Sequence, residues 1–181
     1  MPKTIIDFLY DEFLELRKFL DDSKEISLRS IVDNTFKKTL AISAASYFED
    51  ELRKILLKYF NETSNNNNLV VSFIKNKAIT RQYHTFFDWK SKNANKFLAL
   101  FGEGFKDSAS NDIKADESIE KAVQDFIDLG NTRNELAHLN FADIELNKTA
   151  EEVYDQFKRA LLFLQYFQNK LNAYNEGEQR H

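Results

Sequence analysis

The 181-residue sequence predicts an all-α fold, and three observations support this class. Only four Gly and one Pro are present, whereas sandwiches and barrels need many of both residues at their turns. The aromatic residues are mostly Phe, with 17 Phe and 7 Tyr against one Trp, which suits a core of packed helices. Apolar residues also recur at helical spacing along much of the chain. We therefore expect one domain, residues 1–181, folded as an antiparallel bundle of five to six helices.

The N-terminal third predicts two amphipathic helices. The first ends at about Asp21, and its apolar residues are three and four positions apart: Ile5, Leu9, Phe13, Leu16 and Leu20. The second runs from about Ser27 to about Phe60. We expect one of its faces to carry the following residues: Ile31, Thr35, Thr39, Ile42, Ala45 and Ser46. Small side chains at positions 41–46 would let a neighbouring helix approach closely.

The middle of the chain has a less regular pattern. Residues 61–68 are mostly Asn and predict a mobile polar loop. Two shorter helices are expected at 69–79 and 80–101, the second rich in aromatic residues and ended by glycine. Residues 107–115 are polar and predict a loop.

The C-terminal third predicts two more helices. One begins near Asp116 and continues past Gly130 into the motif described below. The other begins at a capping box, Thr149–Glu152. Its apolar face is expected to consist of these residues: Val153, Phe157, Leu161, Leu164 and Leu171. The tail, residues 175–181, is polar and is expected to fray.

The segment Arg133-Asn134-Glu135-Leu136-Ala137-His138 is the main candidate for a functional site. On a helix, Asn134 and His138 share a face, and Glu135 adjoins it. Arg133 lies five positions before His138, about 140° around the helix, so its long side chain has to bend towards the imidazole.

These residue types suit RNA cleavage by internal attack of the 2′-hydroxyl. The imidazole of His138 can act as a base or an acid at neutral pH. The guanidinium of Arg133 stays charged and offers a planar fork to two phosphate oxygens. Asn134 can orient the imidazole or bind a phosphate oxygen. This chemistry requires no metal ion.

The string Arg-Asn-x-x-Ala-His, between two amphipathic helices, resembles the motif of the HEPN superfamily. The segment from Lys38 to Glu49 is similar to the helix that precedes the motif in prokaryotic HEPN proteins of the RiboL-PSP-like group. The resemblance extends from about Leu28 to Tyr174. It implies a helical bundle in which Arg133 and His138 form the catalytic pair.

The resemblance also implies further site residues and partners. Asn134 and Glu135, with Glu49 on the earlier helix, would bind or orient the substrate; a surface carboxylate is an equally good interpretation of Glu49. Members of the family usually form homodimers in which two motifs share one cleft, and many act in toxin–antitoxin or antiphage systems. An antitoxin or a nucleotidyltransferase is therefore a possible partner. Some toxins carry a Tyr two residues after the His, but Asn140 occupies this position here.

Composition restricts the remaining function classes. The chain has no Cys, and its three His show no metal-ligand spacing, so we expect neither a metal ion nor a cofactor. With a net charge of −4, RNA binding would have to come from a local patch. Lys90 and Lys92, beside Trp89, are candidates for such a patch, although Trp89 and Phe97 are more typical of a core with the lysines in solvent. We expect no signal peptide, no membrane span and a cytoplasmic location.

The leading hypothesis is therefore a metal-independent HEPN-type endoribonuclease that cleaves RNA at a dimer cleft. The alternative from the same family is a non-catalytic HEPN module that binds a nucleotide or a protein partner. A third hypothesis is that the motif is a structural part of a helical scaffold.

Overall fold

The structure is a computed structural model that describes the backbone of residues 2–178 and the side chains of residues 2–174. This part of the chain is 80% helical, with eight α-helices and no strand, which confirms the predicted all-α class. The helix number is close to the predicted five to six. Three of the eight helices are short: α3 (Asn68–Ile74), α4 (Tyr83–Phe86) and α5 (Asn95–Leu98). No helix within residues 2–178 is long and apolar enough to cross a membrane.

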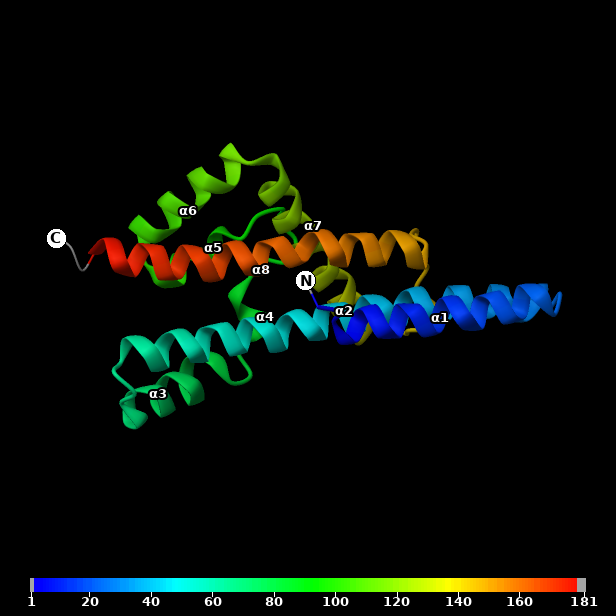
Figure 1. Cartoon of the computed structure of the whole chain (residues 1–181), viewed down its shortest axis with the longest axis horizontal. Coiled ribbons are helices and arrows are strands. Elements are labelled where there is room, and N and C mark those ends of the chain that lie inside the picture. The colour runs from blue at the N-terminus through cyan, green and yellow to red at the C-terminus, as the bar shows by residue number, and fades with distance from the viewer. Residues whose placement is uncertain (1, 179–181) are drawn as a thin grey trace.

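Five longer helices build the frame. Helices α1 (Ile5–Asp22) and α2 (Ile26–Thr63) form a long hairpin whose tip extends beyond the other helices on one side (Figure 1). Helix α8 (Ala150–Glu178) runs along the molecule above this hairpin, and α7 (Glu117–His138) crosses behind α8. Helix α6 (Glu103–Ala115) covers the opposite end, near the end of α8.

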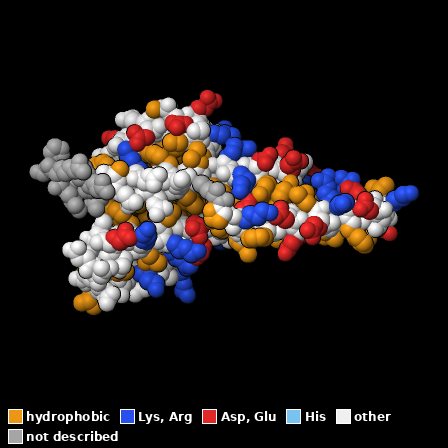
Figure 2. All heavy atoms as spheres, in the orientation of Figure 1, with side chains coloured by type: hydrophobic (Ala, Val, Ile, Leu, Met, Phe, Trp, Pro, Cys, Tyr) orange, Lys and Arg blue, Asp and Glu red, His pale blue; other side chains and the backbone are white. Residues whose placement is uncertain are grey.

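The helical spacing located α1 correctly, but the predicted buried face was partly wrong. Ile5 is 69% exposed, and Leu16 is also exposed. Helix α1 instead turns Tyr10 and Phe13 inward, because it packs between two other helices. The ring of Tyr10 stacks on Tyr154 of α8 at 4.0 Å, and the ring of Phe13 stacks on Phe36 of α2 at 3.9 Å. Apolar side chains therefore remain on the outer surface of the hairpin (Figure 2).

The predicted face of α2 was also largely wrong. Ile31 is 63% exposed because the first turns of α2 belong to the projecting hairpin tip, and Thr35, Thr39 and Ser46 are exposed as well. The buried side chains of α2 lie on a neighbouring face: Leu40, Ala41, Ala44, Ala45, Phe48, Leu52 and Leu56. The small residues predicted to permit close approach include three of these alanines, and all three are buried.

Residues 80–101 do not form the single helix that was predicted. Helix α4 ends at Phe86, residues 87–94 form a loop, and α5 leads into a short 3-10 helix, Ala99–Phe101. The Asp88 carboxylate accepts a hydrogen bond from the backbone N–H of Lys90 at 3.2 Å. Such a local bond occupies an N–H that a helix would need, which favours a turn.

Residues 107–115 belong to α6, so the predicted loop was wrong. Phe105, Ala109 and Ile113 are buried, and their spacing of four residues was a helical signal despite the polar residues between them. Gly102 adopts a φ of 96° before this helix, a left-handed conformation that suits glycine.

The boundaries of the polar loop and of the tail also differ from the prediction. Helix α2 continues to Thr63 and α3 begins at Asn68, so only residues 64–67 form a turn. Asn65 and Asn66 adopt φ values of 51° and 58° there. Helix α8 continues to Glu178, and the rest of the predicted frayed tail, residues 179–181, lies outside the described residues.

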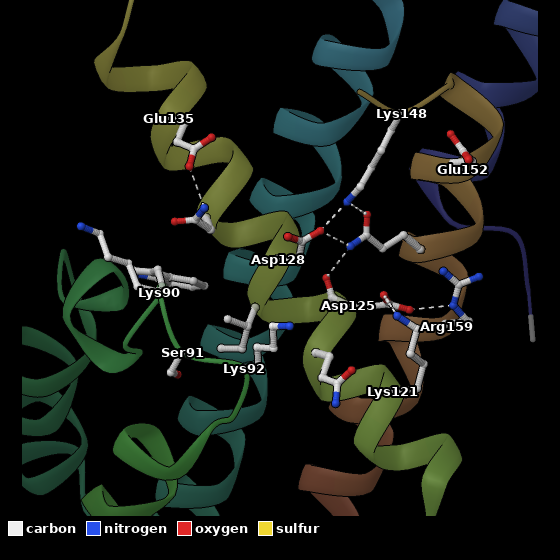
Figure 3. Close-up of a pocket in the computed structure, with 15 residues that line it drawn as sticks. Lys90, Ser91, Lys92, Lys121, Asp125, Asp128, Glu135, Lys148, Glu152 and Arg159 are labelled. Carbon is white, nitrogen blue, oxygen red and sulfur yellow. Dashed lines mark hydrogen bonds and ion pairs between the residues drawn. The ribbon is translucent and has the colours of Figure 1, made fainter. Parts of the chain in front are cut away.

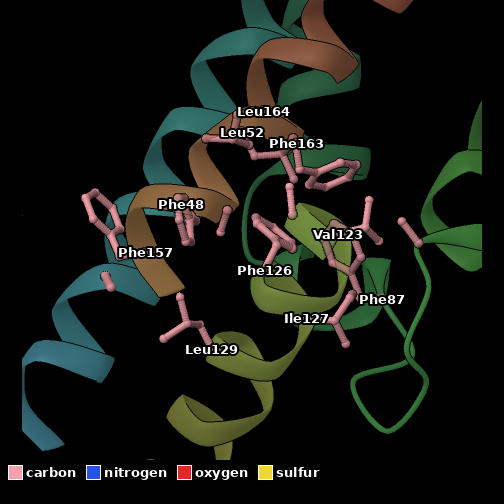
Figure 4. Packing of buried hydrophobic residues seen from close by; sticks show 14 of the residues in the cluster. Phe48, Leu52, Phe87, Val123, Phe126, Ile127, Leu129, Phe157, Phe163 and Leu164 are labelled. Carbon is pink, nitrogen blue, oxygen red and sulfur yellow. The ribbon is translucent and has the colours of Figure 1, made fainter. Parts of the chain in front are cut away.

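The buried side chains form one cluster centred on Phe126 of α7 (Figure 4). The Phe126 ring lies 5.2 Å from Phe48 of α2, 4.9 Å from Phe163 of α8 and 5.1 Å from Phe87 of the loop. Aromatic pairs at these separations add to the stabilisation from burial. Four separate segments are thus held together around one ring.

A buried carboxylate ties α1 to α8. Asp7 is 2% exposed and accepts hydrogen bonds from Tyr154 Oη at 2.5 Å and from Lys158 Nζ at 2.8 Å. Its second oxygen accepts from Thr4, which caps α1. Burial alone would raise the pKa of Asp7, but the hydrogen bonds from Lys158, Tyr154 and Thr4 together lower it below its ordinary value. The charged form therefore stabilises the folded state.

We predict that Asp7→Asn lowers the free energy of unfolding by about 2 kcal/mol at pH 7. Because the folded-state pKa of Asp7 is lowered, its contribution is present above the unfolded pKa and is lost as the pH falls. The deficit of the variant should thus shrink between about pH 4 and pH 2. Urea unfolding at several pH values measures both effects.

Asp11→Asn is the matched control for this prediction. The Asp11 carboxylate pairs with Lys3 at 2.5 Å, but both side chains are exposed. Exposed pairs contribute little, so its variant should lose less than about 1 kcal/mol at pH 7. Equal losses in the two variants would contradict the assigned role of Asp7.

Candidate active site

The motif forms the last two turns of α7. This helix begins after Asp116, whose side chain accepts hydrogen bonds from the backbone N–H groups of Ser118 and Ile119. It ends at His138, so the motif is helical as predicted. Leu136 points into the core, whereas His138 is exposed at the helix end. The helix thus presents the imidazole to solvent.

His138 lies at the edge of an open pocket of about 700 Å³. Three polar residues of α7 line the pocket together with it: Asn131, Asn134 and Glu135. These four residues are spaced at i, i+3, i+4 and i+7, which is one face of a helix. The opposite wall is formed by the loop after α4 and by α5, which contribute Trp89, Lys90 and Lys96. The pocket therefore combines an imidazole, amides, ammonium groups and the carboxylates of Asp88 and Glu135.

Arg133 points towards α2 instead of into this pocket. One guanidinium nitrogen lies 3.8 Å from Glu49 Oε2, and another donates to Asn134 Oδ1 at 3.2 Å. The structure thus brings together Arg133 and Glu49, which the sequence placed on different helices. The Arg133 side chain remains 33% exposed, so a phosphate can still reach the guanidinium.

Tyr83 of α4 lies beside the Glu49–Arg133 pair. Burial and the negative charge of Glu49 raise the pKa of its hydroxyl, and the positive charge of Arg133 opposes this effect. The Tyr83 hydroxyl therefore stays neutral at physiological pH and is not a candidate base. Tyr83 was not predicted as a site residue, because no local spacing connects it to the motif.

Within one chain, the predicted catalytic pair is not assembled in a common pocket. Arg133 does not line the pocket that contains His138, in agreement with their separation of about 140° around the helix. Asn134 connects the two groups, since it accepts from Arg133 and lines the pocket with His138. Asn131 was missed in the sequence, although its position seven residues before His138 places it on the same helical face.

The loop of residues 87–94 is held against α7 by Trp89. A side chain at Gly130 would place its Cβ 2.0 Å from Cζ3 of Trp89, so the indole occupies the space that only glycine leaves free. The indole N–H donates to the carbonyl of His84 at 3.0 Å. Trp89 is partly buried and Phe97 is fully buried, as expected for core aromatics.

Lys92 does not reach the His138 pocket but lines a second pocket of about 710 Å³ beside it (Figure 3). Lys90 belongs to the walls of both pockets. The second pocket is rich in carboxylates that already have partners. The buried Asp125 binds Lys121 at 2.9 Å and Arg159 at 2.6 Å.

The second pocket contains another fixed carboxylate, Asp128. It pairs with Lys148 and accepts a hydrogen bond from Gln156 at 2.6 Å. Burial raises its pKa, but the bonds from Lys148 and Gln156 dominate and lower it. These contacts join α7 to α8 and to the residues before it, so this network fixes the position of the motif helix.

We predict that Gly130→Ala destabilises the protein by about 1–3 kcal/mol, since a methyl group would displace the packed indole of Trp89. The helical preference of Ala, about 1 kcal/mol over Gly, opposes this loss but does not offset it. Thermal unfolding of the purified variants measures the change.

The same substitution in a Trp89→Ala background provides the control. Without the indole there is no clash, so Gly130→Ala should there stabilise α7 by up to about 1 kcal/mol. An equal loss in both backgrounds would show that the indole contact is not the cause.

Comparisons with known proteins assign the chain to a family. Among the side chains of residues 2–174, no three His, Asp or Glu are grouped so that they could hold a metal ion. No curated protein and no solved structure matches the sequence. A family model described as RiboL-PSP-HEPN matches residues 7–173, which include the whole motif and both walls of the His138 pocket. The chain therefore belongs to the RiboL-PSP-HEPN family.

Proposed function

We propose that this protein is a metal-independent endoribonuclease with Arg133 and His138 as its catalytic residues. Family membership supports a HEPN module, a class of domains that often act on RNA. The observation that carries the proposal is the position of His138. Its imidazole is exposed in a pocket that also contains Asn134 and the ammonium groups of Lys90 and Lys96.

The proposed reaction is a transesterification within the RNA. The 2′-oxygen loses its proton and attacks the neighbouring phosphorus, and the bond from phosphorus to the 5′-oxygen breaks. The products are a 2′,3′-cyclic phosphate and a 5′-hydroxyl that has gained a proton. His138 exchanges a proton with one of the two oxygens, and Arg133 stabilises the extra negative charge on the phosphate.

The proposed site requires two chains. Arg133 and His138 of one chain face different directions, so a phosphate at His138 would be contacted by Arg133 of the partner chain. HEPN domains often dimerise, which supports this arrangement. A shared cleft would also concentrate positive charge on a chain with a net charge of −4.

A non-catalytic module that binds a nucleotide is the second candidate function. The contacts of Arg133 with Glu49 and Asn134 favour this non-catalytic module, because they hold the guanidinium away from the imidazole of the same chain. An antitoxin or nucleotidyltransferase partner, a role in antiphage defence and a cytoplasmic location stay predictions.

We predict that the purified protein cleaves single-stranded RNA in the presence of EDTA. His138→Ala should reduce the cleavage rate by at least about 100-fold, because proton transfer is lost. Arg133→Ala should reduce it by about 100-fold or more, because charge stabilisation is lost. Gel analysis and end-group chemistry of the products measure the rate and the cyclic phosphate.

Arg53→Ala is the control for the loss of a guanidinium. Arg53 lies on the same helix as Glu49 but pairs with Asp50 on the surface, so its loss should leave the rate unchanged. Cleavage that survives both motif substitutions would refute the catalytic assignment. Tight nucleotide binding without any RNA turnover would favour the non-catalytic module.

A mixing experiment tests the two-chain site. We expect the His138→Ala and Arg133→Ala proteins to be inactive alone and to regain roughly a quarter of the wild-type rate when equal amounts exchange subunits. In a mixed dimer, one site then lacks both groups and the other retains both. Absence of recovery, with subunit exchange shown by mass spectrometry, would mean that each site takes both residues from one chain.

A further inference from the structure

The charge of this protein is unevenly distributed along the chain. Residues 63–102 contain six Lys and Arg and a single carboxylate, Asp88, which gives this segment a net charge of +5. The whole chain has a net charge of −4, so the remainder is strongly acidic. We call residues 63–102 the basic arm; its cations are Lys75, Lys77, Arg81, Lys90, Lys92 and Lys96. It comprises α3, α4, α5 and the segments between them.

The six cations of the basic arm are available to a ligand. All six side chains are exposed, and none is ion-paired with a carboxylate among the described residues. By contrast, most cations on the motif helix and on α8 are neutralised, for example Lys121 and Arg159 by Asp125. The arm therefore carries much of the uncompensated positive charge of an acidic molecule.

Aromatic contacts hold the arm against the motif helix. Trp89 occupies the space over Gly130, and the Phe87 ring lies 5.1 Å from Phe126 of α7. Tyr83 packs against Trp89 at 5.4 Å and lies beside Arg133. The buried ring of Phe87 and the partly buried rings of Tyr83 and Trp89 fix the backbone of the arm, so the lysines that follow Trp89 have a defined position relative to the motif.

The cations nearest the motif border the pocket of His138. Lys90 and Lys96 line it directly, and Lys92 lines the neighbouring pocket that shares the walls formed by Trp89 and Lys90 (Figure 3). The other three cations lie before Tyr83 in the chain, on and after the π-helix Lys75–Ile79. These three cations follow α3, in which Phe73 is 67% exposed.

We propose that the basic arm is the RNA-docking surface of the protein. Lys90, Lys92 and Lys96 would contact the phosphates next to the bond at His138, and the cations before Tyr83 would contact phosphates further along the strand. This inference rests on the proposed function for the identity of its ligand. Ammonium groups without a base-reading pocket make contacts that do not depend on sequence. An exposed aromatic ring such as Phe73 offers a stacking surface to unpaired bases.

The experiment separates binding from cleavage. RNA affinity is measured in a His138→Ala parent, in which the substrate stays intact, by the anisotropy of a fluorescein-labelled oligouridine of about 20 nucleotides. The arm variant adds Lys90→Gln, Lys92→Gln and Lys96→Gln to this parent. A matched control adds Lys18→Gln, Lys24→Gln and Lys37→Gln on the α1–α2 hairpin, which removes the same charge from cations that are also unpaired among the described residues.

The salt dependence gives a quantitative expectation. Each phosphate contact to a single strand contributes about 0.7 to the slope of log affinity against log salt, so the arm variant should lose about 2 from this slope. Between about 50 and 200 mM salt, the parent should therefore lose about twenty-fold more affinity than the arm variant. The control should keep the slope of the parent. Thermal unfolding verifies that all variants fold, which is expected since the substituted side chains are exposed, except for the half-buried Lys37.

A second arm variant, Lys75→Gln, Lys77→Gln and Arg81→Gln, tests the distant part of the surface and should also reduce the slope. The proposal would be overturned if the arm and control variants changed the salt slope equally, or if neither changed it. It would also be overturned if the parent bound an acidic protein but not the oligouridine. Cleavage by the wild type without arm-dependent binding would leave the ribonuclease standing and refute the arm. Arm-dependent binding without any cleavage would support the arm as the RNA-docking surface and refute the ribonuclease.

Discussion

Helix α7 is packed on several sides by aromatic rings, and this packing determines where the motif can act. Phe126 contacts Phe48, Phe163 and Phe87, which belong to α2, α8 and the loop after α4. In the last two turns Leu136 is buried on the core side, while Arg133 faces α2. Asn131, Asn134, Glu135 and His138 share the face that lines the pocket. The placement of the polar residues is thus a consequence of how the apolar side of the helix is buried.

The same aromatic packing holds the basic arm of this otherwise acidic protein against α7. The indole of Trp89 lies where a side chain at Gly130 would otherwise stand, so a single missing methyl group allows the loop to rest on α7. Lys90 follows directly and lines the pocket of His138. A uniformly positive protein would attract RNA anywhere on its surface, whereas a localised charge attracts it to one place. Because the arm is packed against α7, its positive charge stays next to the pocket of His138.

The motif itself is divided by helical geometry. Residues five apart on a helix point in directions about 140° apart, and no rotamer of His138 changes this. In one chain, Arg133 therefore finds Glu49 and Asn134, while His138 faces the basic arm. Each chain thus presents both groups, but to different sides, and the proposed two-chain site rests on this division.

Local patterns in the sequence determined the all-α class, the presence of α1, α2, α7 and α8, the capping box at Thr149 and the helical state of the motif. Helical periodicity and end-capping depend on residues within a few positions of one another, so they can be read without the fold. Only the tertiary structure decided which face of α1 and α2 is buried, since Tyr154 and Phe36 lie far away in the chain or on another helix. It also broke residues 80–101 at Asp88 and placed Glu49 beside Arg133. The motif was therefore recognisable from its own residues, whereas its pocket depends on long-range packing of aromatic side chains that no local spacing encodes.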